Sequence, residues 1–345
     1  MTQSRTEELN TYRRIYELNS TPFKNNTFQE DEKVSFADIM FIQNNLYESK
    51  DYKHLLEFYN IFNNEDEIVK WMKRRPSGTY RLKVVFGDPD IVVVIPTIDH
   101  ENRFSNNCLN NIFKGLTIIF VESGKNLYFN FAHNVNAGIS KAIELGAKWI
   151  IVSNDDKNKV DESNVLVNEL SSLDNNLEQI LVPRTDHGGY IMKYRKNTEL
   201  IKPILKSFKP YFSVEEKFGI YYRFYIYEKS LLGKIISRLF LKKIVEIKFL
   251  GSFFILSSNY CKNNNNEVFD ETYVNGFEDV DLALRQIYSN NTIKGINYAI
   301  GDIGGQSLGT GELRSHYRGI LNRTYFNWKD GKMLNKMLKS PGFKH

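Results

Sequence analysis

Two short groups of polar side chains carry the clearest chemical potential in this sequence. The first, Asn154, Asp155 and Asp156, follows directly on the apolar run Trp149–Ser153. Carboxylate and amide oxygens are the ligands that hard divalent cations prefer, and such a cation can in turn hold a diphosphate. The alternative is an ordinary turn after a strand, because Asn and Asp are also favoured turn residues.

The second group stands at the start of a predicted helix. Glu278, Asp279 and Asp281 crowd its first turn, ahead of Leu282 and Arg285. Acids at a helix N-terminus are ordinary capping and dipole chemistry. On their own they do not separate a stabilising role from a catalytic one.

The elements that must position these groups indicate an α/β fold. Ile91–Ile95 and Leu116–Val121 are β-branched runs too short for helices, as in parallel strands buried on both faces. A helical pattern runs from Asn130 to Gly146 and leads into the strand before Asn154. This alternation predicts βαβ units and an open, mostly parallel sheet flanked by helices, with ligands outside the carboxyl ends of its strands. Further strands are predicted at 179–182 and 251–256.

The first 88 residues differ from the rest of the chain in their sequence pattern. Helical patterns occupy Ser35–Leu46 and Glu65–Arg74, and the second begins with acids and ends with bases, which suits the helix dipole. We therefore expect a helical accessory segment over residues 1–88, an α/β domain over 89–330 and a C-terminal tail over 331–345.

Composition limits the expected partners and location. A hydrophobic fraction of 41% and a charged fraction of 25% are those of a soluble globular protein. The net charge of +5 is too small to favour nucleic acid as the partner. Two cysteines set no disulfide framework, the N-terminus has no signal-peptide pattern, and no apolar run is long enough for a membrane span. A cytoplasmic protein is expected.

Leu231–Lys242 is an amphipathic stretch. On a helical period its apolar side chains share one face, and Lys234, Arg238 and Lys242 form a basic stripe beside them. One interpretation is a surface helix packed on the sheet. The other is a helix that lies on an anionic membrane surface and brings the protein to a lipid-linked acceptor.

Five short motifs follow one another along the chain: Val93–Thr97, Asn136–Ile139, Asn154–Asp156, Phe269–Glu271 and Glu278–Arg285. In this order they resemble the signatures of the family 2 glycosyltransferases, especially the rhamnosyltransferase-like branch. The similarity runs from about Asp90 to Trp328. It implies the GT-A fold of nucleotide-diphospho-sugar transferases, an open sheet with a Rossmann-like nucleotide half and an acceptor half.

The resemblance implies a donor site at the strand ends. Asp156 would be the principal ligand of Mg²⁺ or Mn²⁺, with Asn154 and Asp155 supporting it or holding the ribose. Glu122 matches the acidic residue that reads the nucleotide base. Further contacts to the nucleotide-sugar are expected from Thr97, Asp99, Asn136, Arg314 and His316.

The resemblance also implies an acceptor side at the second acidic group. Asp279 matches the catalytic base, and Glu278 matches the residue that orients the acceptor. Displacing a nucleoside diphosphate from an anomeric carbon needs a cation on the leaving group and a base on the opposite face. One in-line displacement inverts the anomeric centre.

Two positions depart from the family pattern. Family members often carry a His that contacts the metal or the diphosphate where this chain has Asp302. An Asp can still bind a hard cation, so Asp302 is a candidate metal ligand. The Arg often seen before the Asn-x-Gly element is Val135 here. The Gly-rich stretch that follows and its basic neighbours form either a lid over the diphosphate or a solvated loop: Gly304–Gly311, Arg314, His316 and Arg318.

The leading hypothesis is an inverting, metal-dependent glycosyltransferase of glycan biosynthesis. It would move a sugar from a nucleoside-diphosphate-sugar donor to a hydroxyl of a glycan or lipid-linked acceptor, in the cytoplasm or at the membrane surface. A nucleotidyltransferase on a similar sheet would normally carry a Gly-rich, basic loop after the first strand, which Pro96–Asn102 is not. A non-catalytic sugar- or nucleotide-binding module is the alternative from another class, and it is kept open by Asp302 and Val135.

Overall fold

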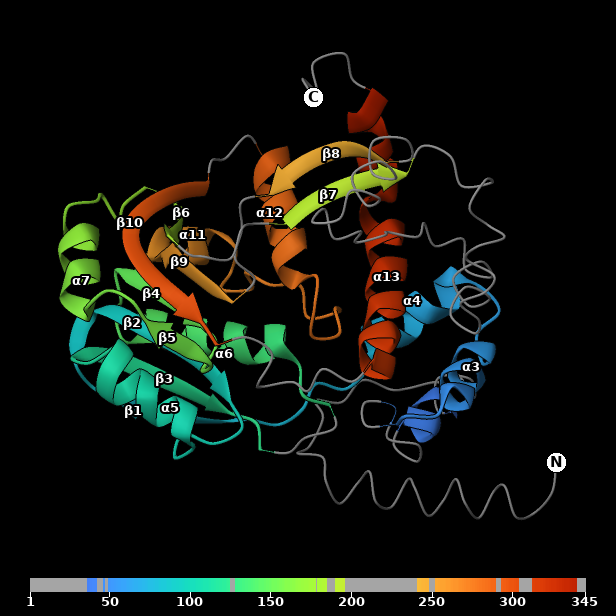
Figure 1. Cartoon of the computed structure of the whole chain (residues 1–345), viewed down its shortest axis with the longest axis horizontal. Coiled ribbons are helices and arrows are strands. Elements are labelled where there is room, and N and C mark those ends of the chain that lie inside the picture. Colours follow the sequence, from blue (N-terminus) through green and yellow to red (C-terminus); the bar gives the residue numbers. More distant parts are fainter. Residues whose placement is uncertain are drawn as a thin grey trace, which may run out of the picture.

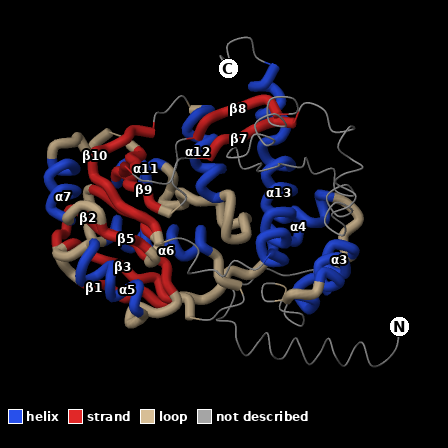
Figure 2. Tube along the Cα trace, viewed as in Figure 1, coloured by secondary structure: helices blue, strands red, loops and turns tan. Residues whose placement is uncertain are grey.

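The structure is a computed structural model of an α/β protein built on a curled eight-stranded sheet with helices on both faces (Figures 1 and 2). An α/β fold flanked by helices is therefore confirmed. The structure describes residues 36–41, 46, 49–124, 128–177, 179–184, 190–195, 241–247, 252–289, 293–303 and 312–339.

The main sheet is mixed in direction, so the prediction of a mostly parallel sheet is wrong. Strands β3, β2 and β4 are mutually parallel, and β6 is parallel to β10. Strand β9 enters between β4 and β6 antiparallel to both, and the two edge strands, β1 and β5, are also antiparallel to their neighbours. A short apolar run looks the same in either direction, which is why its pattern did not predict this. The strands in order across the sheet are β1 (Arg81–Val85), β3 (Leu116–Glu122), β2 (Asp88–Thr97), β4 (Trp149–Ser153), β9 (Phe253–Ser257), β6 (Ile180–Arg184), β10 (Ile293–Asp302) and β5 (Lys157–Lys159).

Alternating side chains of the central strands enter two separate apolar cores. In β2, Val92 and Val94 belong to one core, while Ile91, Val93 and Ile95 belong to the other. Strand β3 alternates in the same way and is buried along its whole length. The predicted burial of these strands on both faces is confirmed, because helices cover both sides of the sheet.

One face of the sheet carries most of the helices. The first core joins it to α6 (Phe131–Glu144), α11 (Ser258–Asn263), α12 (Glu278–Tyr288) and α13 (Glu312–Lys339). The second core, on the other face, is closed by the π-helical turn η1 (Cys108–Ile112), which continues α5 (Arg103–Asn107), and by α7 (Ser163–Ser171).

Helix α6 lies close to the sheet and follows its predicted bounds. The Asn130 side chain caps it by accepting a hydrogen bond from the His133 N–H at 3.1 Å, and Gly146, with φ of +83°, follows its C-terminus. Gly138 in its middle faces the side chains of Val94 and Val121 at a distance that leaves no room for a Cβ atom. The glycine of the Asn-x-Gly motif therefore allows the helix to pack directly on β2.

The N-terminal helices pack on α13. Helix α3 (Tyr52–Asn60) is tied to it by Tyr59, whose hydroxyl donates to the Tyr317 carbonyl at 2.8 Å. Helix α4 has the predicted bounds, Glu65–Arg74, and residues 36–41 are helical within the stretch predicted at 35–46. Strand β1 belongs to the main sheet although it precedes residue 89; the division into three parts stays a prediction.

A separate two-stranded antiparallel sheet consists of β7 (Tyr190–Arg195) and β8 (Leu241–Ile247). Most of the predicted amphipathic helix, residues 231–240, lies outside the described residues, whereas Leu241 and Lys242 begin β8. Among the helices that the structure describes, none has the length and apolar character needed to cross a membrane.

Candidate functional site

The carboxyl ends of three parallel strands bring most of the predicted donor residues to one edge. Thr97 ends β2 and lies in register with Glu122, which ends β3. Strand β4, on the other side of β2, leads directly into Asn154–Asp156. This is the arrangement expected for parallel strands, whose carboxyl ends meet at a single edge of the sheet.

Thr97 is hydrogen-bonded to several other side chains of this edge. Its hydroxyl donates to Asp155 Oδ2 at 2.9 Å and lies 3.0 Å from Ser105 Oγ, while the Asn102 side-chain amide donates to the Thr97 oxygen at 2.8 Å. Burial raises the pKa of Asp155, the bond from Thr97 opposes that rise, and the nearby Asp156 adds to it. A hydrogen bond thus joins Thr97 directly to Asp155, and their motifs did not predict this contact.

The edge is completed by the ends of β5 and β10. Asp156 is buried, its carbonyl accepts the Ile303 N–H at 3.0 Å, and the antiparallel pairing sets Asp302 opposite Lys157. The two predicted metal ligands, Asp156 and Asp302, therefore lie on adjacent chain segments. The Asn154 N–H donates to the Ser252 carbonyl at 3.0 Å, which fixes the start of the same turn.

Lys157 is a neighbour of Asp302 that the motifs did not predict. Only 1% of the residue is exposed, and its ammonium donates to Asp302 Oδ2 at 3.2 Å and to Ser252 Oγ at 2.5 Å. Burial lowers the pKa of Lys157, while the Asp302 carboxylate raises it. One oxygen of Asp302 is therefore engaged by a cation of the protein itself.

The residues of this edge carry oxygen donors of the kind that hard cations bind. Asn154 and Asp156 have amide and carboxylate oxygens, which are suitable ligands for Mg²⁺ or Mn²⁺, and their role as ligands stays a prediction. Asp302 fits less simply, because its Oδ2 also accepts a hydrogen bond from Ser252 at 2.9 Å in addition to the one from Lys157. Its assignment as a metal ligand stays a prediction.

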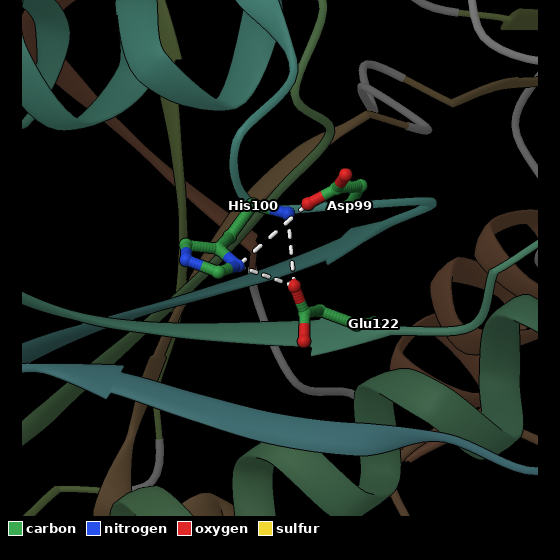
Figure 3. Close-up of side chains that lie close together, drawn as sticks. All are labelled: Asp99, His100 and Glu122. Carbon is green, nitrogen blue, oxygen red and sulfur yellow. Dashed lines mark hydrogen bonds and ion pairs between the residues drawn. The ribbon is translucent and has the colours of Figure 1, made fainter.

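Glu122 is held by residues from two other segments, and Figure 3 shows its contact with one of them, His100. Arg81 Nε of β1 donates to one carboxylate oxygen at 2.7 Å; the other oxygen accepts the His100 N–H at 3.0 Å and lies 2.5 Å from His100 Nδ1. Burial alone would raise the pKa of Glu122, but these hydrogen bonds outweigh it and lower the pKa to about 2. The carboxylate is therefore ionised at every physiological pH.

Asp99, His100 and Glu122 also form a group that can hold a metal, since one ligand atom of each lies within 4.8 Å of the others. In this structure both Glu122 oxygens already accept hydrogen bonds, from Arg81 and His100. Asp99 is mostly exposed and lies 3.7 Å from His100 Nδ1. We therefore describe the group as a hydrogen-bonded cluster. The roles of His100 and Arg81 were not predicted from the sequence, because nothing in their spacing links them to Glu122.

Asn136 has a bridging role in the structure. Its side-chain amide donates to the Phe269 carbonyl at 2.8 Å and to Glu271 Oε1 at 3.0 Å, and its oxygen accepts the Phe269 N–H at 3.1 Å. These bonds tie α6 to the Phe-Asp-Glu motif 133 residues away in the chain. The predicted contact of Asn136 with a nucleotide is untested.

The turn before α12 is docked on the N-terminus of α6. Asn275 accepts the Phe131 N–H at 2.8 Å and donates to the Phe129 carbonyl at 2.9 Å. Asn275 and Phe277 have φ of +47° and +75°, a region that side chains larger than Asn rarely adopt. Such backbone strain clusters at functional sites, where the surrounding contacts enforce it. Glu278 and Asp279 follow this strained turn at once.

The acids of α12 differ in their surroundings. Glu278 is 4% exposed, and burial together with the neighbouring Asp279 raises its pKa to about 7. Asp279 keeps some exposure, and burial raises its pKa to about 6. Asp281 is instead fully buried and accepts hydrogen bonds from Arg285 at 3.0 Å and Lys329 at 2.8 Å. Asp281 thus connects α12 to α13, whereas the pKa values of Glu278 and Asp279 lie close to neutral pH.

The basic residues beyond Asp302 lie on a helix. Arg314, His316 and Arg318 belong to the first turns of α13, which corrects their interpretation as part of a loop. Gly304–Gly311, the rest of the predicted lid, lies outside the described residues. Arg318 Nη1 donates to the Asn275 carbonyl at 2.8 Å, so this side chain reaches the strained turn.

A cavity of about 450 Å³ lies behind the Phe-Asp-Glu motif. Lys329 on its wall bridges Asp270 and Asp281, with 2.8 Å to each. The cavity is lined by Asn136, Glu267, Phe269, Asp270, Glu271, Thr272, Arg285 and Lys329.

No protein-family model matches this chain, and no curated protein is significantly similar to it in sequence. Inferences about its function therefore rest on its own residues and their geometry.

Proposed function

We propose that this protein is an inverting, metal-dependent glycosyltransferase with a GT-A fold. The observation that carries the proposal is the carboxyl of Asp279, whose pKa burial raises to about 6, directly after a strained turn. A general base works best when its pKa lies near the operating pH. The turn is docked on α6, the helix that follows β3 and packs against β2 and β3, and this supports the proposal that Asp279 acts near the strand ends.

The donor side is supported by the ordered strand ends. A nucleoside-diphosphate-sugar would lie across the edge that carries Thr97, Glu122 and Asp155, with Asp99 beside the base. Asp156 and Asn154 would hold Mg²⁺ or Mn²⁺, and the bound cation would offset the charge that develops on the leaving diphosphate. Further donor contacts proposed from the sequence are Asn136, Arg314 and His316, and Asp302 is proposed as a further metal ligand.

The acceptor side is supported by the paired acids of α12. Glu278 would orient an acceptor hydroxyl, and Asp279 would remove its proton as the oxygen attacks the anomeric carbon. The new bond joins that oxygen to the anomeric carbon, the bond to the diphosphate oxygen breaks, and the proton stays on Asp279. Attack from the face opposite the leaving group inverts the anomeric centre. A glycan or a lipid-linked glycan is the acceptor class proposed.

The test is release of nucleoside diphosphate from a panel of nucleotide-sugars with Mg²⁺ or Mn²⁺ and a mixture of sugar acceptors. We expect one donor to be turned over by the wild type, and Asp279→Asn to lower the rate at least about a hundredfold while donor affinity is kept. Asp174→Asn, on an exposed turn, is the matched control and should be fully active. No turnover of any donor, or a fully active Asp279→Asn variant, would overturn the proposal.

A further inference from the structure

Within the part of the chain that the structure describes, two buried polar atoms near the strained turn have no hydrogen-bond partner. They are Glu278 Oε1, in the first turn of α12, and Arg318 Nε, on α13. Buried polar groups are nearly always hydrogen-bonded, and an unsatisfied one costs about 1–3 kcal/mol. Two such atoms beside one turn indicate a place that a ligand completes.

The turn itself places the two side chains together. Arg318 Nη1 donates to the Asn275 carbonyl at 2.8 Å, three residues before Glu278, which leaves the other edge of the guanidinium for another partner. The positive charge of Arg318 lowers the pKa of Glu278 against the larger effect of burial, which agrees with this proximity. Asp279 and Arg318 both keep some exposed surface, so a ligand reaches Glu278 from their side.

The chemistry of the two groups selects the ligand. An anionic group would be attracted by Arg318 but repelled by Glu278 and Asp279. An ammonium group would be attracted by the two acids but repelled by Arg318. A neutral hydroxyl satisfies both, because it donates to a carboxylate oxygen and accepts from a guanidinium N–H. Two neighbouring hydroxyls of a sugar ring satisfy both without any change of charge.

We infer that Glu278 and Arg318 form a subsite for an uncharged sugar unit, which they hold through its hydroxyl groups. This inference deepens the proposed function, on which its description as the acceptor subsite rests. It adds Arg318 as a specificity-determining residue and names the acceptor unit as a neutral sugar, not a uronic acid or an amino sugar. Sugar binding itself can be measured without any donor.

The test uses ligand-observed NMR with methyl glycosides of neutral hexoses and deoxyhexoses, each paired with its uronic acid or amino sugar counterpart. We expect at least one neutral glycoside to bind and its charged counterparts to bind at least about tenfold more weakly. Glu278→Gln and Arg318→Met should each weaken binding of the neutral glycoside about tenfold or more, as expected for one hydrogen bond to a charged group. Arg318→Lys should be as weak as Arg318→Met, because Lys keeps the charge but has no Nε–H.

The matched control is Arg323→Met on the same helix, whose Nε donates to the Gly319 carbonyl at 2.8 Å. This variant should bind the glycoside as the wild type does, and circular dichroism should show all variants folded. Binding that is unchanged in Glu278→Gln and Arg318→Met, or equal binding of neutral and charged sugars, would overturn the subsite. If glycosides bind as expected but no nucleotide-sugar is turned over, the proposed transferase activity fails and the subsite stands.

Discussion

Replacing Glu122 by Gln tests the cluster at the end of β3. A pKa lowered from 4.5 to about 2 corresponds to about 3 kcal/mol of stabilisation at neutral pH. Because the Arg81 side chain is 77% exposed, solvent screens its share, and we expect the variant to lose about 1–2 kcal/mol of unfolding free energy. Gln keeps an acceptor oxygen, so the loss comes mainly from the charge.

The sign of the pH dependence follows from the lowered pKa. The ionised carboxylate stabilises the fold fully above about pH 4.5, and this contribution is lost as the pH falls towards 2. Urea unfolding of the wild type and of Glu122→Gln should therefore differ at pH 7 and converge in acid. Glu162→Gln, which removes an exposed ion pair with Lys159, is the matched control and should change stability by less than about 0.5 kcal/mol.

Two results would refute this reasoning. Equal stability of the wild type and Glu122→Gln at pH 7 would mean that the hydrogen bonds from Arg81 and His100 contribute nothing. A difference that stays constant down to pH 2 would mean that it arises from packing, since a packing effect does not titrate.

Three further predictions concern the base, the buried lysine and the helix contact. Because Asp279 must be ionised to act and has a pKa of about 6, the transfer rate should fall about tenfold per pH unit below 6; a flat profile from pH 5 to 7 would contradict the assignment. Lys157→Met should cost about 3–5 kcal/mol in urea unfolding, and adding Asp302→Asn should recover part of it; strictly additive losses would argue against the ion pair. Gly138→Ala should cost about 1–3 kcal/mol because its Cβ overlaps Val94, and thermal unfolding should show partial recovery on adding Val94→Ala.

The sequence predicts the elements whose side chains repeat regularly. The strands at 91–95 and 116–121, the helix capped by Asn130 and the helix at Glu65–Arg74 all form, because their apolar spacing matches the faces that they bury. Strand direction was not predictable from such runs. The polar edge strand Lys157–Lys159 was missed because its burial depends on a partner, Asp302, far along the chain.

The residues of the candidate site were likewise predicted in part. Residues of one motif, such as Asp155 and Asp156, or Glu278 and Asp279, were found together because their sequence neighbourhood places them together. The contacts between motifs were not foreseen: Arg81 on Glu122 and Lys157 on Asp302 join segments that only the folded sheet brings together. Pairing of this kind depends on which strands are neighbours and on their register, and the local periodicity of the sequence does not determine either.

The two edges of the main sheet have a consequence for association between copies of the chain. Among the described strands, the edges are β1, with Arg81 and Lys83 exposed, and β5, which is only three residues long. An open sheet edge is a template for a strand of another molecule, and short length and basic side chains are the usual protection. A second copy that approached β1 would bring the two Lys83 side chains together, and β5 offers too few residues to pair with a long strand. Both features oppose edge-to-edge aggregation while the sheet stays open.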